Sequence, residues 1–167
     1  MQTFVHIAPA KLENHIRRSG LKPGKELFGY TRNKHIYAFP VLENYVHTHQ
    51  WAREVLKWRR QPLVSVYFRI PDDEPVLLKH IRSDFVETTA QVANTAIRQR
   101  EDPRGFEVLL PRNVSAKEIT RIAPVRGVVG WRHMPDAHAH KPCGCPACVM
   151  RGEPGGRRLR EAYERGE

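Results

Sequence analysis

The stretch FVHIAPAKLENHIRRSGLKPG, residues 4–24, decides how the fold begins. Phe4–Ile7 is a short, mostly apolar run and predicts a strand. Ala10–Ser19 predicts a helix, because its apolar residues recur on one face at helical spacing. Gly20 is suited to cap the end of that helix, and Pro23 prevents the helix from continuing. The sequence therefore predicts a strand followed directly by a helix.

Further strands and helices are expected downstream. The predicted strands are 35–39, 63–70, 76–80, 106–110 and one or two within 119–129. The predicted helices are 42–58, a short one beginning at the capping box of Ser115 and Glu118, and 157–165. The turn PDDEP suggests that 76–80 returns beside 63–70 as a hairpin, while 83–98 fits either a helix or a strand.

The order of these elements indicates an α+β fold with a mixed or antiparallel sheet. The regular alternation of a doubly wound sheet is missing. No glycine-rich phosphate loop follows a strand, which argues against the P-loop and the dinucleotide-binding fingerprint.

The composition favours an anionic ligand. The 167 residues include 28 Lys and Arg against 18 Asp and Glu, which gives a net charge of +10. Such a charge attracts nucleic acid, nucleotides and other phosphate-bearing partners. No run approaches the ~20 apolar residues of a membrane span, and no signal peptide is apparent at the start. We expect a cytoplasmic protein that does not associate with membranes.

All three cysteines lie in DAHAHKPCGCPAC, residues 136–148. Cys143, Cys145 and Cys148 offer three thiolates, and His138 or His140 can complete the four ligands that structural zinc prefers. We favour His138, because Lys141-Pro142 stiffens the step from His140 to Cys143. The competing interpretations are three free cysteines or a redox-sensing cluster.

A catalytic zinc of the deaminase type does not fit this segment. That chemistry needs a glutamate in an H-x-E motif and a proline before the C-x-x-C pair. His140 stands where the glutamate would be, and Pro146 lies inside the pair. We therefore predict a structural zinc in a C-terminal extension, 131–167, that follows a first domain at 1–130.

Three stretches in their order resemble the ADP-ribosyltransferase superfamily, in its His-Tyr-Glu branch of diphtheria-toxin-like and poly-ADP-ribose-polymerase-like enzymes. The stretches are FVHIAPAKLENHIRRSGLKPG, HIYAFPVLENYVHTHQWA and RGFEVLLPRNVSAKEI. The last also resembles a segment of bacterial DNA ADP-ribosyltransferase toxins. The resemblance covers roughly residues 4–125 and implies a split sheet of the ADP-ribosyltransferase type.

The resemblance also implies roles for single residues in cleaving NAD. Glu107 matches the catalytic glutamate, whose carboxylate would stabilise an oxocarbenium-like centre and orient ribose hydroxyls. His6 matches the histidine that binds the adenine-side ribose, and Tyr37 the tyrosine that stacks on nicotinamide. Lys22, Lys25 and Arg32 lie in the basic loop that could cover the pyrophosphate.

The chain departs from the family pattern at two places. Ile7-Ala8 follow His6 where the family has glycine and serine or threonine, and Pro40-Val41 replace small residues after the second strand. Each site residue also has an ordinary interpretation: a core histidine, a packed tyrosine and a solvent-facing glutamate.

Two functions follow as hypotheses. The first is an NAD-dependent ADP-ribosyltransferase that transfers ADP-ribose to nucleic acid or protein and carries a structural zinc. The alternative is a non-enzymatic, basic, zinc-stabilised module that binds nucleic acid on a degenerate transferase scaffold. An enzyme requires His6, Tyr37 and Glu107 to line one cleft, whereas a binding module would have that cleft closed.

Overall fold

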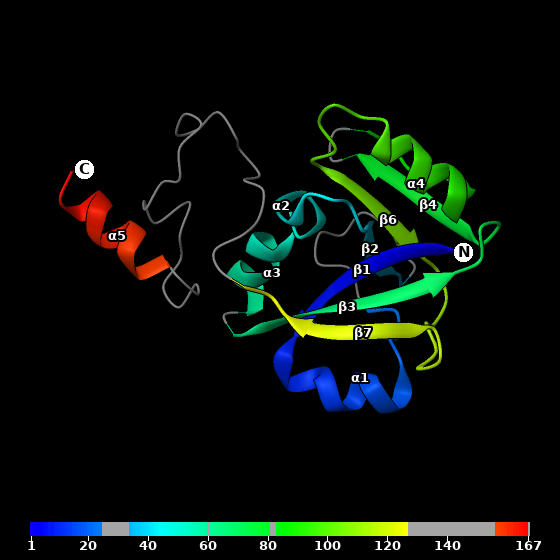
Figure 1. Cartoon of the computed structure of the whole chain (residues 1–167), viewed down its shortest axis with the longest axis horizontal. Coiled ribbons are helices and arrows are strands. Elements are labelled where there is room, and N and C mark those ends of the chain that lie inside the picture. The colour runs from blue at the N-terminus through cyan, green and yellow to red at the C-terminus, as the bar shows by residue number, and fades with distance from the viewer. Residues whose placement is uncertain (25–33, 60, 81–82, 127–155, 167) are drawn as a thin grey trace.

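The computed structural model describes residues 1–24, 34–59, 61–80, 83–126 and 156–166. The fold is mixed α+β, as expected, and is built on one seven-stranded sheet (Figure 1). The strands are β1 Gln2–Pro9, β2 Ile36–Pro40, β3 Leu63–Ile70, β4 Pro75–His80, β5 Val86–Thr89, β6 Phe106–Leu110 and β7 Ile119–Pro124. The helices are the 3₁₀ turn η1 Ala10–Leu12, α1 Glu13–Ser19, α2 Tyr45–Thr48, α3 Ala52–Arg59, α4 Ala90–Arg98 and α5 Gly156–Glu164.

The sheet order is β5-β4-β6-β2-β1-β3-β7, and the neighbouring strands pair antiparallel throughout the described chain. The join between β1 and β2 is short, with only Phe4↔Pro40 and Val5↔Phe39 in register. By contrast, β1 and β3 pair along their whole length, from Gln2↔Ile70 to Pro9↔Leu63. The two halves of the sheet, β1-β3-β7 and β2-β6-β4-β5, therefore separate beyond Val5.

Helices α4 and α3 pack against the strands of the sheet. Helix α4 contacts β1, β2, β4 and β5, and its buried Ala90, Ala93 and Ile97 join the main core. Within that core the rings of Phe4 and Phe68 stack with their centroids 6.2 Å apart. Helix α3 contacts β1 and forms a second, smaller cluster around Leu56. Figure 1 shows α1 beyond β3 and β7, away from α4.

The helix cap predicted at Gly20 is confirmed. Helix α1 ends at Ser19. Gly20 follows with a φ of 74°, and its backbone N–H donates to the Ile16 carbonyl. A Cβ atom on Gly20 would lie 2.0 Å from the carbonyl oxygen of Val114. The residue there must therefore be glycine for two reasons, the positive φ and the close approach of the backbone.

The predicted hairpin of 63–70 with 76–80 is wrong. Both segments are strands, but β3 pairs with β1 and β7, while β4 pairs with β5 and β6. The turn after Ile70 therefore carries the chain from one half of the sheet to the other. Arg112 holds this crossing, because its guanidinium makes paired hydrogen bonds to Glu74 at 2.7 and 2.8 Å and also binds Glu118.

Two helix predictions also need correction. The helix expected over 42–58 is two helices, α2 and α3, separated at His49–Trp51, and Asn44 caps the first by accepting from Val46 N and His47 N. The helix expected after Ser115 is a single turn. Its predicted pair exists, because Glu118 accepts from the Ser115 N–H and hydroxyl, but β7 begins at Ile119.

The region 83–98, which the sequence left open, forms β5 and then α4, and the tail helix predicted at 157–165 is α5. Among the residues that the structure describes, no helix is both long and apolar enough to cross a membrane. The boundary predicted between 130 and 131 falls in 127–155, outside the described residues.

Candidate functional site

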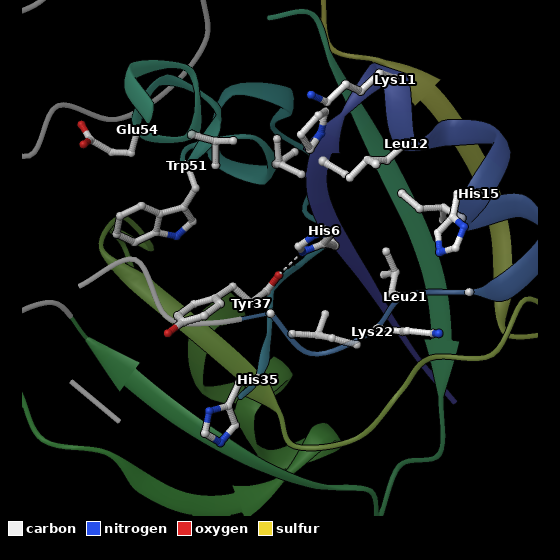
Figure 2. A pocket seen from close by; sticks show the side chains of 18 of the residues that line it. His6, Lys11, Leu12, His15, Leu21, Lys22, His35, Tyr37, Trp51 and Glu54 are labelled. Atoms are coloured by element: carbon white, nitrogen blue, oxygen red, sulfur yellow. Dashed lines mark hydrogen bonds between the residues drawn. The ribbon is translucent and has the colours of Figure 1, made fainter. Parts of the chain in front are cut away.

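A cavity of about 410 Å³ lies where the two halves of the sheet separate (Figure 2). Its walls come from β1, from α1 and the chain after it, from β2, from the α2–α3 corner and from β6. The volume falls within the range of about 300–1,000 Å³ that small-molecule sites usually have. His6, Lys22, Tyr37 and Glu107, four of the residues predicted from the sequence, all line it.

His6 stands at the point of separation. It follows the last β1–β2 pair, Val5↔Phe39, and its Nδ1 lies 2.7 Å from the carbonyl oxygen of Tyr37 (Figure 2). Since a carbonyl can only accept, Nδ1 carries the proton. Burial lowers the pKa of His6 below its usual value, and the hydrogen bond to Tyr37 offsets only part of this effect. The ring is therefore neutral near pH 7, and Nε2 is left as an acceptor.

Tyr37 and Glu107 project from the same side of their half of the sheet. Tyr37 pairs with Leu109 of β6, and Glu107 lies two residues before Leu109. Directly opposed residues and residues two apart share one face of a sheet. Both side chains are partly buried and reach the cavity.

The cavity has a basic side at α1. Lys11, His15 and Lys22 line this side, and Figure 2 shows His15 and Lys22 across the cavity from Trp51, with Lys11 apart from them. Lys22 was predicted as a phosphate ligand, whereas Lys11 was not. Arg32 and Lys25, the other predicted phosphate ligands, fall in 25–33, outside the described residues.

Trp51 and Glu54 line the cavity without having been predicted as site residues. The sequence favours a core role for Trp51, because aromatic residues seven apart on a helix usually pack inside. Its indole N–H instead donates to the Phe106 carbonyl at 2.9 Å, and one face of the residue stays at the cavity. The one signal in the sequence was the indole N–H itself, which usually finds an acceptor when it is shielded from water.

The predicted zinc ligands Cys143, Cys145, Cys148 and His138, with the alternative His140, lie in 127–155, outside the described residues. Within the described residues no group of three or more His, Cys, Asp or Glu side chains could hold a metal ion.

Comparison of the chain with protein-family models, with curated proteins and with solved structures finds no match.

Proposed function

We propose that this protein is an NAD-dependent ADP-ribosyltransferase that releases nicotinamide and transfers ADP-ribose to nucleic acid or protein. The proposal depends mainly on one observation. His6, Tyr37 and Glu107 are far apart in the sequence, yet they lie on three neighbouring strands, β1, β2 and β6, and all three line one open cavity. Those are the residues that the resemblance to this superfamily requires together. The split antiparallel sheet is also consistent with the fold that the resemblance implies.

The distribution of charge supports a dinucleotide with a cationic end. Lys11 and Lys22 lie on the α1 side, whereas the carboxylates of Glu54 and Glu107 come from the α3 and β6 walls. NAD carries a negative pyrophosphate in its middle and a positive nicotinamide at one end. In the proposed pose the pyrophosphate lies at the lysines and nicotinamide lies against Tyr37, near Trp51.

In the proposed reaction the bond between the nicotinamide nitrogen and C1′ of the ribose breaks. The bonding electrons leave with nicotinamide, and C1′ acquires the positive charge of an oxocarbenium ion. The Glu107 carboxylate stabilises that charge and orients the ribose hydroxyls. A nucleophilic atom of the acceptor then bonds to C1′ and gives up its proton to Glu107 or solvent. Water in place of the acceptor gives hydrolysis.

His6 is suited to bind a ribose hydroxyl. Because its Nδ1–H donates to Tyr37, the neutral Nε2 can accept a hydrogen bond from a hydroxyl in the cavity. The same bond ties His6 to the backbone that carries the Tyr37 ring. His6, which would bind the ribose, and the Tyr37 ring, which would stack on nicotinamide, are therefore held at a fixed spacing.

The competing hypothesis is a basic module that binds nucleic acid and has no catalytic cleft. The open cavity favours the enzyme, because a binding module would have that cleft closed. The net charge of +10 still favours nucleic acid as the acceptor.

The test is the isosteric substitution Glu107→Gln. Nicotinamide release from NAD should fall by about 100-fold or more, because the amide can still bind the ribose hydroxyls but lacks the charge that stabilises the oxocarbenium ion. The dissociation constant for NAD should stay within about threefold. Glu87→Gln is the matched control, because Glu87 is exposed on β5 and does not line the cavity.

Wild-type protein must first be assayed with NAD alone and with RNA, DNA and protein acceptors. Protein that neither binds nor cleaves NAD under any of these conditions rules out the proposed function. Nucleic-acid binding with a steep salt dependence and no NAD binding would favour the module.

A further inference from the structure

The short turn before Glu107 is held by side chains from the α2–α3 corner. In this turn, Asp102–Gly105, the Arg104 N–H donates to the Asp102 carboxylate at 3.0 Å. Gly105 follows with a φ of 83°, which glycine adopts readily and other residues rarely do. Strand β6 begins at Phe106, so this turn sets where the strand starts.

Gln50 makes two hydrogen bonds to this turn. Its Nε2 donates to the Pro103 carbonyl at 3.2 Å, and its Oε1 accepts from the Gly105 N–H at 2.7 Å. The side chain is only 1 % exposed. Because the buried amide uses both its donor and its acceptor, it fixes the positions of the Pro103 carbonyl and the Gly105 N–H.

Trp51 binds the next residue of the same segment. Its Nε1–H donates to the Phe106 carbonyl at 2.9 Å. The registered pairing of β6 with β2 ends at Ala38↔Val108, whereas the pairing with β4 continues to Phe106. The indole therefore supports the start of β6 beyond the last registered pair with β2.

We infer that Gln50 and Trp51 are positioning residues, which fix the place of the Glu107 carboxylate in the cavity by clamping the residues before it. The inference rests on the proposed function for its catalytic consequence. Gln50 is not among the residues that line the cavity, so it can act only through the turn. Trp51 does line the cavity, and its positioning role is its hydrogen bond to Phe106. A carboxylate at the start of a strand depends on such support, because a displacement of about 1 Å can cost about 100-fold in rate.

The first test is kinetic and uses Gln50→Met, which keeps the length of the side chain and removes both hydrogen bonds. The kcat for nicotinamide release should fall by about 10- to 100-fold, with KM for NAD within about threefold of wild type. Trp51→Phe, which keeps an aromatic ring and loses the N–H, should also lower kcat.

Asn94→Leu is the matched control. Asn94 is a buried amide of α4 that donates to Gln2 Oε1 and accepts from Arg98 Nε, and it does not line the cavity. This variant also loses two side-chain hydrogen bonds, so its melting temperature should fall about as much as that of Gln50→Met, while its kcat should stay unchanged.

The second test needs no NAD. Hydrogen exchange follows the Gly105 amide, and the ¹³C chemical shift of the Glu107 carboxyl in protein with labelled glutamate reports the surroundings of that group. Gln50→Met should speed exchange at Gly105, whose N–H loses its acceptor, and should move the Glu107 signal, whereas Asn94→Leu should change neither.

Unchanged Gly105 exchange and an unchanged Glu107 signal in Gln50→Met, or equal losses of kcat in Gln50→Met and Asn94→Leu, would overturn the inference. If the wild-type protein does not cleave NAD, the proposed function is lost, and the NMR comparison alone then decides whether the clamp places Glu107.

Discussion

At the scale of single residues, His6 joins the two halves of the sheet where their backbone pairing stops. Its Nδ1–H replaces a strand hydrogen bond by donating to the Tyr37 carbonyl. The residue is partly buried, and burial keeps the ring uncharged. A charged imidazole there would be destabilising, so the protonation state of His6 links the integrity of the site to pH.

The pH dependence of stability follows from this lowered pKa. The folded chain binds the His6 proton at a lower pH than the unfolded chain, where the ordinary value is 6.5. Unfolded chains therefore take up protons first as the pH falls, and the free energy of unfolding declines below about pH 6.5. The slope from one histidine is at most about 1.4 kcal/mol per pH unit.

Urea unfolding of wild type and His6→Gln between about pH 5 and pH 8 measures this slope. His49, whose pKa burial also lowers, contributes with the same sign to both proteins, so the difference between them isolates His6. We expect a shallower decline below pH 6.5 in His6→Gln. If the free energy of unfolding falls equally with pH in the two proteins, the pKa of His6 is not lowered in the folded chain.

The residues of the site differ in how far the sequence reveals them. His6, Tyr37 and Glu107 were predicted through a family resemblance, and the structure brings them to one cavity. The role of Gln50 could not be predicted from the sequence. Its partners are backbone atoms of Pro103 and Gly105, and no pattern of side chains indicates such a contact. Interactions with distant backbone depend on the tertiary fold and leave little trace in sequence.

At the scale of elements, the turn after α1 is packed against a distant part of the chain. Leu21 and Val114 exchange backbone hydrogen bonds of 2.8 and 3.0 Å directly beside Gly20. Gly20→Ala places a Cβ atom 2.0 Å from the Val114 carbonyl oxygen and forces a positive φ on alanine. We expect a loss of at least about 2 kcal/mol in the free energy of unfolding.

The matched control for this prediction is Gly24→Ala. Among the described residues, apart from its chain neighbours, no atom lies within 4 Å of a Cβ built on Gly24, so this variant should change stability by less than about 0.5 kcal/mol. Chemical denaturation measures both variants. Equal stability of Gly20→Ala and wild type would mean that the α1 turn relaxes away from Val114.

Elements were predicted well where local pattern decides them. The strands at 63–70 and 106–110 were placed to the residue, because alternation between two prolines defines the first and Pro111 ends the second. The partner of 76–80 was wrong, because alternation specifies a strand and not its neighbour. The break between α2 and α3 was missed because 49–51 contains neither glycine nor proline, and the corner is held instead by the hydrogen bonds of Gln50 and Trp51.

At the scale of the whole molecule, the proposed catalytic residues and the predicted zinc ligands occupy separate parts of the chain. The last described residue that lines the cavity is Glu107, whereas the predicted ligands begin at His138. The zinc prediction comes from the sequence alone, because its segment lies outside the described residues. Its test can therefore be made independently of NAD.

Elemental analysis of the full chain, purified without added metal, should find about one zinc per molecule. Cys145→Ser should lose it, because a hydroxyl is a poor substitute for a thiolate. His138→Gln should weaken zinc binding, whereas His140→Gln should retain it if His138 is the fourth ligand. A competition assay with a zinc chelator ranks the three variants. Stoichiometric zinc in all three would exclude this ligand set, and absence of zinc from wild type together with reactive thiols would favour free cysteines.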